Sequence, residues 1–271
     1  MADKVEWRKV WEQKAAEGLS DFELDRGRSP IDQETENLSE RELLNFIEPK
    51  ESETILDAGC GTGVNILRLH SRVRRIVGID YARGSLERCR KSVQLQKIKN
   101  THVCVASVTA IPLPGRSVNK VVCLSVLQYL GDEQARQALR EFVRVLVPDG
   151  TIILHVKNLS SVYWSTLWLA KKVKVLLGGT TRIEYFRSFQ WYANELAALE
   201  CNVLGYDSFN LLLLDVMPQR LVATVRRFEL RHHGSPFFRL SFVRRHGAEL
   251  MVKARVACAS TKASGTRKAL G

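Results

Sequence analysis

Asp57-Ala58-Gly59-Cys60-Gly61-Thr62-Gly63 is the stretch that decides the fold of this chain. The short apolar run 54–56 precedes it, and residues 64–69, whose apolar side chains have helical spacing, follow it. Strand, glycine turn and helix in this order are typical of a nucleotide-binding crossover unit. Glycines let the chain turn tightly and let a ligand lie against bare backbone, and the following helix points unpaired N–H groups at the turn.

The spacing of the glycines separates two interpretations of this turn. A dinucleotide fingerprint has the spacing G-x-G-x-x-G, whereas here the glycines fall at every second position and an acid stands two residues ahead of the first. A carboxylate serves a pyrophosphate poorly and a cationic amino group well, because opposite charges attract. The pattern DAGCGTG resembles the first motif of the class I methyltransferases that use S-adenosylmethionine. The resemblance implies a cofactor turn made of Asp57, Gly59, Gly61 and Gly63; the alternative is a tight turn without a ligand.

Strands and helices alternate through the first 156 residues. The pattern predicts strands at 54–58, 75–80, 101–106, 120–124 and 151–156, and helices at 64–71, 84–96 and 132–146. Such alternation predicts a parallel, doubly wound α/β sheet. Later in the chain we expect helices at 159–177 and 189–200 and strands at 202–209 and 250–256.

Over residues 40–256 this layout resembles the class I methyltransferase architecture, a Rossmann-like seven-stranded sheet whose last strand is antiparallel. It is most similar to the branch that includes ubiquinone-pathway and sugar or lipid methyltransferases. We expect an N-terminal helical cap at 1–48, the methyltransferase domain at 49–256 and a disordered basic tail at 257–271. Helical lid insertions are expected at about 159–190 and 210–247.

Five further residues are candidates for binding the cofactor. Asp80 ends the second predicted strand about 20 residues after the glycine turn, where a carboxylate accepts the ribose hydroxyls of a nucleoside. The alternative is an acid that caps the next helix. The resemblance places Tyr81 against the adenine edge and Leu124 beside the methionine part. Ser107 stands where the family usually has Asp, so it offers a hydroxyl without a charge, and the backbone N–H of Val108 can pair with the adenine ring.

The acceptor side is less sharply marked. Methyl transfer from a sulfonium is a direct displacement, so alignment is the main task of the protein. A hydroxyl acceptor also benefits from a base, and His155 at the end of the fifth predicted strand is the candidate, with a packed structural histidine as the alternative. The resemblance adds acceptor-site candidates, Gln128, Asn158, Tyr185 and Arg187. The guanidinium of Arg187 suits a phosphate or carboxylate, and the alternative is a solvated arginine on an aromatic lid.

The positive charge is concentrated in the second half of the chain. Residues 1–150 carry 23 Lys and Arg against 22 Asp and Glu, and residues 151–271 carry 18 against 7, a net charge of +11. This asymmetry indicates an anionic acceptor, nucleic acid, an acidic membrane surface or a basic solvated face. On the predicted helix 159–177 one stripe pairs tryptophans with lysines, a combination that suits a bilayer interface, with a lid helix packed on protein as the alternative. Its members are Trp164, Trp168, Lys171 and Lys172.

The cysteines show no metal-ligand spacing and no secretory signal opens the chain, so we expect no metal and a cytoplasmic location, with peripheral membrane contact as a second interpretation.

The sequence thus predicts a methyltransferase that uses S-adenosylmethionine and acts, at oxygen, on a small or lipid-linked acceptor. One alternative is an RNA methyltransferase that uses the arginine-rich segment 220–245. Another is a regulatory protein that binds the cofactor without turnover.

Overall fold

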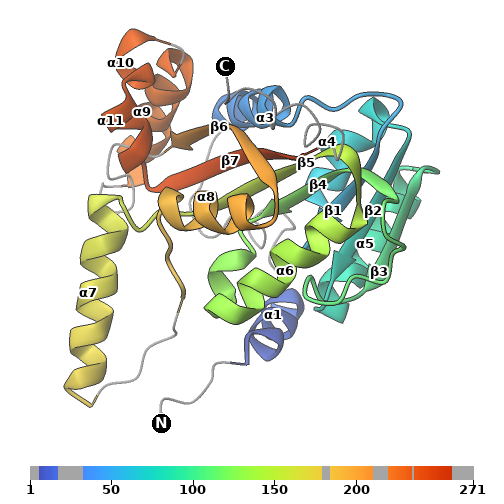
Figure 1. Cartoon of the computed structure of the whole chain (residues 1–271), viewed down its shortest axis with the longest axis horizontal. Helices are drawn as coiled ribbons and strands as arrows, with labels where there is room; N and C mark the ends of the chain where they lie inside the picture. The colour runs from blue at the N-terminus through green and yellow to red at the C-terminus, as the bar shows by residue number, and fades with distance from the viewer. Residues whose placement is uncertain (1–5, 18–32, 179–183, 210–218, 234, 258–271) are drawn as a thin grey trace, which may run out of the picture.

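The structure is a computed structural model that describes residues 6–17, 33–178, 184–209, 219–233 and 235–257. Its strands are β1 (Thr54–Ala58), β2 (Arg75–Asp80), β3 (Thr101–Val105), β4 (Val118–Leu124), β5 (Leu146–Lys157), β6 (Cys201–Phe209) and β7 (Glu249–Val256). They form one seven-stranded sheet in the order β3-β2-β1-β4-β5-β7-β6 (Figure 1). β7 runs antiparallel to both of its neighbours. The predicted Rossmann-like sheet with an antiparallel last strand is confirmed.

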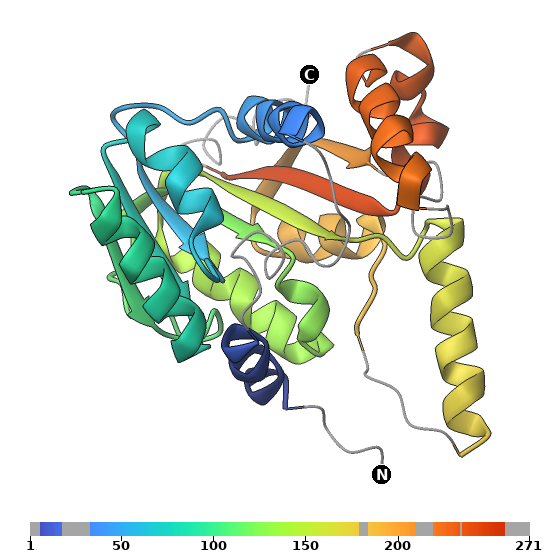
Figure 2. The same cartoon turned by 180° about the vertical axis from the view of Figure 1, so that it is seen from behind.

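Helices cover both faces of the sheet. They are α1 (Trp7–Ala16), α3 (Gln33–Ile47), α4 (Val64–Leu69), α5 (Arg83–Leu95), α6 (Asp132–Val145), α7 (Val162–Leu176), α8 (Phe189–Ala198), α9 (Gln219–His232), α10 (Pro236–Arg239) and α11 (Ser241–His246). Crossover connections run from β1 toward one edge of the sheet and from β4 toward the other, and connections of this kind are right-handed almost without exception. Consequently α6 and α8 lie in front of the sheet in Figure 1, and α4 and α5 lie in front of it in the reverse view of Figure 2.

β1 is buried along its whole length, because both of its faces are covered. Successive side chains of a strand point to opposite faces. Leu56 accordingly belongs to the same buried cluster as Phe142 of α6, and Ile55 to the same cluster as Ile66 of α4. The two hydrophobic clusters hold the central strand rigidly, and the glycine turn begins where this strand ends.

β5 is longer than the sequence predicted. It begins at Leu146, inside the expected helix, and pairs there with Val118. Val147 precedes Pro148, and a residue before proline is displaced from the helical to the extended region. The helix α6 therefore ends one residue earlier, at Val145, and the chain continues directly into the strand.

The two N-terminal helices are fixed to different parts of the sheet domain. The carboxylate of Glu12 on α1 accepts hydrogen bonds from the N–H groups of Arg83 and Gly84, at 2.7 and 2.9 Å, and so caps the first turn of α5. At the end of α3 the buried ammonium of Lys120 donates to the carbonyl oxygen of Ile47 and to the Glu53 carboxylate, both at 2.9 Å. Each helix is therefore part of the packing of the domain.

The later insertions form two groups of helices. α7 projects away from the sheet in both views, and α9 to α11 lie at the same end of the molecule (Figures 1 and 2). α9 is joined to α3 by ion pairs from Arg227 and Arg231 to Glu34. Within the described residues no helix is long and apolar enough to cross a membrane. The predicted basic tail lies, beyond residue 257, outside the described residues.

Candidate functional site

A cavity of about 800 Å³ lies at the carboxyl ends of the parallel strands. It sits where the strand order reverses between β1 and β4, the place at which open α/β sheets bind ligands. Its walls come from the glycine turn, from the ends of β2, β4 and β5, from α1 and α9, and from the beginning of β7. The cavity thus joins segments from the N-terminal and C-terminal parts of the chain.

The glycine turn is held against the end of β2. The N–H of Gly59 donates to the carbonyl oxygen of Ile79 at 2.7 Å. The N–H of Gly61 donates to Oδ2 of Asp80 at 3.0 Å, and the N–H of Ala82 to Oδ1 at 2.8 Å. Burial raises the pKa of Asp80, and these amide hydrogen bonds act in the opposite direction. The carboxylate is fixed in the cavity wall by the backbone amides of Gly61, Tyr81 and Ala82, and part of its capacity to accept hydrogen bonds remains for a ligand.

The turn fits a nucleoside cofactor because it presents backbone instead of side chains. Gly59 has a φ of +84°, and a Cβ built on it would lie 2.2 Å from Cγ2 of Val126. Gly61, with a φ of +53°, lines the cavity with its backbone. The remaining predicted contacts that the structure brings to the same cavity are Asp80, Tyr81, Ser107, Val108 and Leu124.

Two members of the predicted turn lie elsewhere. Asp57 is buried within β1, and Gly63 lies at the start of α4; neither is among the described residues that line the cavity. A Cβ on Gly63 would lie 2.5 Å from Sγ of Cys89, so this glycine permits close packing of α4 against α5. Both residues are buried parts of the turn, and their direct contact with the cofactor stays a prediction. Their place in the motif reflects the folding of the turn.

His155 stands in the cavity between two polar partners. Its Nδ1 lies 2.9 Å from Oγ of Ser125, and its Nε2 lies 3.4 Å from Oε2 of Glu249. All three residues line the cavity. Glu249 was not predicted as a site residue, because the antiparallel pairing of β5 with β7 brings it there and no local pattern marks it.

Ser125 has an unusual backbone conformation. Its φ is +59°, in the left-handed region that residues other than glycine rarely adopt and that costs roughly 1–3 kcal/mol. The N–H of Ser125 donates to the carbonyl oxygen of His155 at 2.8 Å, so the same neighbour holds both its backbone and its hydroxyl. Such strain is concentrated at functional sites. The left-handed backbone of Ser125 directs its hydroxyl toward the imidazole of His155.

α1 supplies an aromatic wall that the sequence did not assign to the site. The rings of Trp7 and Trp11 lie 4.5 and 5.6 Å from the ring of Tyr129, and all three side chains line the cavity. Burial raises the pKa of Tyr129 to about 12, so its hydroxyl stays protonated at neutral pH. The i, i+4 spacing of the tryptophans, which places both on one face of a helix, was the available signal.

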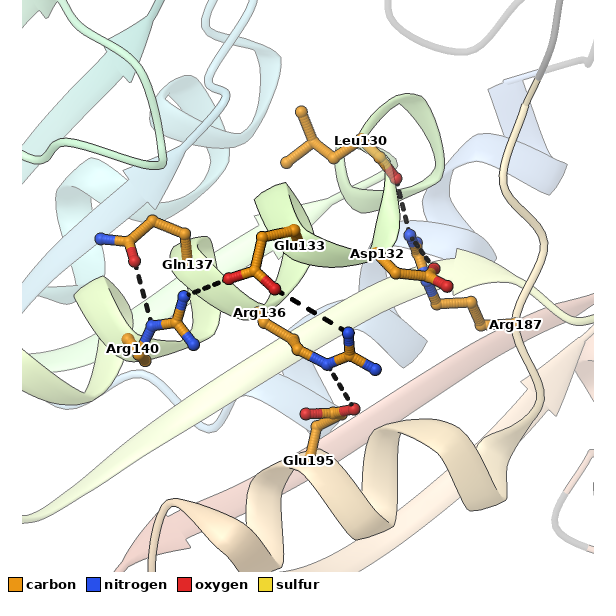
Figure 3. A network of polar contacts seen from close by, with 8 residues as sticks. All are labelled: Leu130, Asp132, Glu133, Arg136, Gln137, Arg140, Arg187 and Glu195. Atoms are coloured by element: carbon orange, nitrogen blue, oxygen red, sulfur yellow. Dashed lines mark hydrogen bonds and ion pairs between the residues drawn. The ribbon is translucent and has the colours of Figure 1, made fainter.

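Arg187 is buried and fully occupied by the protein. Its Nε donates to Asp132 at 3.0 Å, and its Nη1 to the carbonyl oxygen of Leu127 at 2.9 Å. Its Nη2 donates to the carbonyl oxygen of Leu130 at 2.6 Å (Figure 3). Only 4% of the residue is exposed, and it is not among the described residues that line the cavity. The prediction that Arg187 holds an acceptor anion is wrong; the residue fixes the loop that carries Tyr129.

Replacing Arg187 with Met should therefore lower the free energy of unfolding by about 3 kcal/mol or more, because two buried carbonyl oxygens lose their donors. Urea unfolding followed by circular dichroism measures the change. Arg140→Met is the matched control, since this exposed guanidinium bonds Glu133 and Gln137 on its own helix (Figure 3). The control should change stability by less than about 0.5 kcal/mol. Equal values for both variants would show that Arg187 has no structural role.

Two other acceptor candidates are also buried. The main-chain carbonyl oxygen of Gln128 accepts the N–H of Tyr185 at 2.7 Å, whereas its side-chain Oε1 is buried without a hydrogen-bond partner among the described residues. Asn158 is buried, and its Nδ2 donates to the carbonyl oxygens of Arg245 and Gly247 at 2.8 and 2.9 Å. Neither is among the described residues that line the cavity, whereas Tyr185 is. The structure corrects the prediction for Asn158, whose side-chain amide is used by the protein, and Gln128 and Tyr185 stay acceptor-site candidates.

A different arginine, from the arginine-rich segment 220–245, lies in the cavity wall. Arg226 lines the cavity, and its Nε is buried without a hydrogen-bond partner among the described residues. Leu230, one turn later on α9, lines the cavity as well, beside Phe209 and Met251. The wall formed by α9, β6 and β7 thus combines an available cation with apolar side chains.

The comparisons with known proteins agree with this geometry. Residues 55–150 match the family described as "Methyltransferase domain". The malonyl-[acyl-carrier protein] O-methyltransferase of Serratia marcescens is 33% identical over 113 residues, which are 41% of this chain and 41% of that protein. The "Probable tRNA methyltransferase 9B" of Bos taurus is 29% identical over 110 residues, 40% of this chain and 22% of that protein. The chain spans less than half the length of these curated relatives.

A solved structure shares the fold over most of the chain. It is the methyltransferase in complex with the Trm112 methyltransferase activator of Haloferax volcanii, with a TM-score of 0.62, 18% identity, and coverage of 91% of this chain and 97% of that one. The sheet, the glycine turn against Asp80 and the family match together define a Rossmann-like methyltransferase domain. The chain carries a domain of the class I methyltransferases, and the cofactor of this domain is S-adenosylmethionine.

Proposed function

We propose that the protein transfers a methyl group to a hydroxyl oxygen of a small or lipid-linked acceptor that carries an anionic group. The observation that carries this proposal is a single cavity that holds both the Gly61–Asp80 contact and the Ser125–His155 contact. A cofactor site and a candidate base therefore open into the same cavity. Alignment of the reacting groups in one site is what a direct displacement requires.

In the cofactor half of the cavity, main-chain groups and one acidic side chain would hold the cofactor. The backbone at Gly59 and Gly61 would lie against the ligand, and Asp80 would accept the ribose hydroxyls; all three residues line the cavity. The adenine and methionine parts meet three residues, Tyr81, Val108 and Leu124. When bound, S-adenosylmethionine supplies a methyl carbon on a positively charged sulfur.

The three polar residues form a route for the acceptor proton. A carboxylate beside Nε2 favours the tautomer that carries hydrogen there, so Nδ1 of His155 keeps its lone pair toward Ser125. The acceptor hydroxyl passes its proton to Oγ of Ser125 as Ser125 passes its own proton to Nδ1. Glu249 then stabilises the imidazolium. The acceptor oxygen keeps the electron pair with which it attacks.

The acceptor half suits an amphipathic molecule. Leu230 and Met251 offer apolar contact area, and Arg226 supplies a guanidinium for a phosphate or carboxylate. Trp7 and Trp11 line the same cavity and would exclude water from the reacting groups. These observations support an acceptor with an apolar body and an acidic group.

Replacing Asp80 with Ala should weaken the binding of S-adenosylmethionine at least about tenfold, because two hydrogen bonds from the ribose to a charged group are lost. Titration calorimetry measures the affinity, after circular dichroism has shown that the variant is folded. Glu87→Ala removes the same charge from an exposed position on α5 and should bind as the unchanged protein does. Unchanged affinity in Asp80→Ala would overturn the assignment of the cofactor half.

The acceptor class is tested with labelled S-adenosylmethionine and a host extract separated into aqueous, lipid and RNA fractions. We expect label in the lipid or small-molecule fraction, and less of it with Arg226→Gln. Label in ribonuclease-sensitive material would favour an RNA acceptor, which the similarity to a tRNA methyltransferase suggests as the second candidate. Cofactor binding without label in any fraction would favour a regulatory protein without turnover.

A further inference from the structure

α7 is an apolar helix that the described part of the chain leaves largely uncovered. Its sequence, VYWSTLWLAKKVKVL, contains three lysines and no acid. It projects away from the sheet in both views (Figures 1 and 2). Leu169 is 57% exposed and Leu176 is 85% exposed, although burying a leucine side chain is favourable. An apolar face of this kind marks an interaction site.

The exposed apolar residues lie on one face of α7. Leu169, Ala170, Val173 and Leu177 follow helical spacing and line one shallow groove, together with Thr166 and Lys174. At 100° per residue, Lys172 falls on one side of this face and Lys174 on the other, and both are exposed. The face is therefore an apolar stripe with a cation along each border.

The opposite face of α7 contacts protein. The ring of Trp164 lies 4.9 Å from that of Phe186, and Nζ of Lys157 lies 4.3 Å above the Trp164 ring. The stripe of Trp164, Trp168, Lys171 and Lys172 that the sequence suggested for a bilayer is thus partly turned inward. Trp164 and Lys171 of that stripe face protein, and the face available to a partner is that of Leu169 and Val173.

Glu184 fixes which face points outward. Its carboxylate pairs with Lys157 at 2.7 Å and with Lys171 at 3.1 Å. Burial alone would raise the pKa of Glu184, and the two lysines outweigh burial and lower it, so the group stays ionised at neutral pH. The pairing with Lys171 holds the inward face of α7 against the segment that carries Glu184.

We propose that the outward face of α7 docks on the surface of an anionic phospholipid bilayer. The leucines and Val173 would enter the boundary between headgroups and acyl chains, while Lys172 and Lys174 meet the phosphates. The charge of the chain supports this occupant, because α7 has no acid and residues 151–271 carry a net charge of +11. A second copy of the chain would oppose like charges along both borders of the stripe. This inference does not depend on the identity of the methyl acceptor.

Flotation of the full chain with vesicles of phosphatidylcholine, with or without phosphatidylserine, tests the proposal. The unchanged protein should float with anionic vesicles and be released by high salt. Leu169→Gln combined with Leu176→Gln should weaken binding at least about tenfold, because two apolar side chains that enter the bilayer are lost. Lys172→Gln combined with Lys174→Gln should weaken binding to anionic vesicles by roughly tenfold or more, at about 1 kcal/mol for each lysine near the surface.

Leu95→Gln is the matched control for the leucine variant. Leu95 is 73% exposed on α5, away from α7, so its replacement should leave flotation unchanged. All of the altered residues are exposed, and circular dichroism checks that each variant is folded. The proposal is overturned if the unchanged protein stays unbound, or if the α7 variants float as Leu95→Gln does. It is also overturned if sedimentation shows that the α7 leucines hold two copies of the chain together.

Discussion

Replacing His155 with Gln should lower kcat by roughly 10²–10⁴-fold and leave the affinity for S-adenosylmethionine within about twofold, since a positioned general base contributes in this range. Glutamine keeps a polar group of similar reach near Ser125 and cannot take up a proton. The rate is measured as transfer of labelled methyl into the acceptor fraction, and the affinity by calorimetry. The two readouts separate loss of the base from loss of the cofactor site.

Glu249→Gln should have a smaller effect on the same reaction than His155→Gln. Glu249 lies 3.4 Å from Nε2 of His155 and acts through it, so its loss should lower kcat about tenfold while KM for the acceptor changes less than about twofold. A purely structural role would instead appear in the unfolding free energy. If His155→Gln keeps the full rate, alignment alone accelerates the transfer, and the proton route through Ser125 is wrong.

The cofactor half of the site could be predicted because its determinants are local. A glycine turn after a buried strand and an acid at the end of the next strand lie together in every sheet with this strand order. Gly61 and Asp80 accordingly meet through a hydrogen bond of 3.0 Å. The exceptions, Asp57 and Gly63, have the residue types of the motif but face the interior of the domain. The pattern specified the turn without specifying which of its members line the cavity.

The acceptor half could not be predicted, because arginines are chemically alike in a sequence and differ only in their partners. Arg187 donates to two carbonyl oxygens of a loop that lies 60 and 57 residues earlier in the chain. On α9, Arg227 and Arg231 pair with Glu34 of α3, and this packing leaves Arg226 toward the cavity. Glu249 reached His155 by antiparallel strand pairing in the same way.

Replacing Gly59 with Ala should weaken the binding of S-adenosylmethionine by more than about 100-fold, the loss that corresponds to about 3 kcal/mol. The new Cβ would lie 2.2 Å from Cγ2 of Val126, and the φ of +84° is strained for any residue that has a side chain. The turn must therefore shift, and its shift carries Gly61 away from Asp80. Calorimetry measures the affinity and urea unfolding measures the stability.

Alanine substitutions at two other glycines are controls that distinguish the steric clash at Gly59 from its backbone strain. Gly178 has a φ of +81° with open space around its Cβ position, so Gly178→Ala should cost about 1–2 kcal/mol of stability and no affinity. Gly205 has neither restriction, and Gly205→Ala should change stability by less than about 0.5 kcal/mol. Adding Val126→Ala to Gly59→Ala removes the clashing methyl group and should restore part of the affinity, while the strain remains. If the double variant binds no better than Gly59→Ala, the contact with Val126 does not set the position of the turn, and backbone strain alone accounts for the loss.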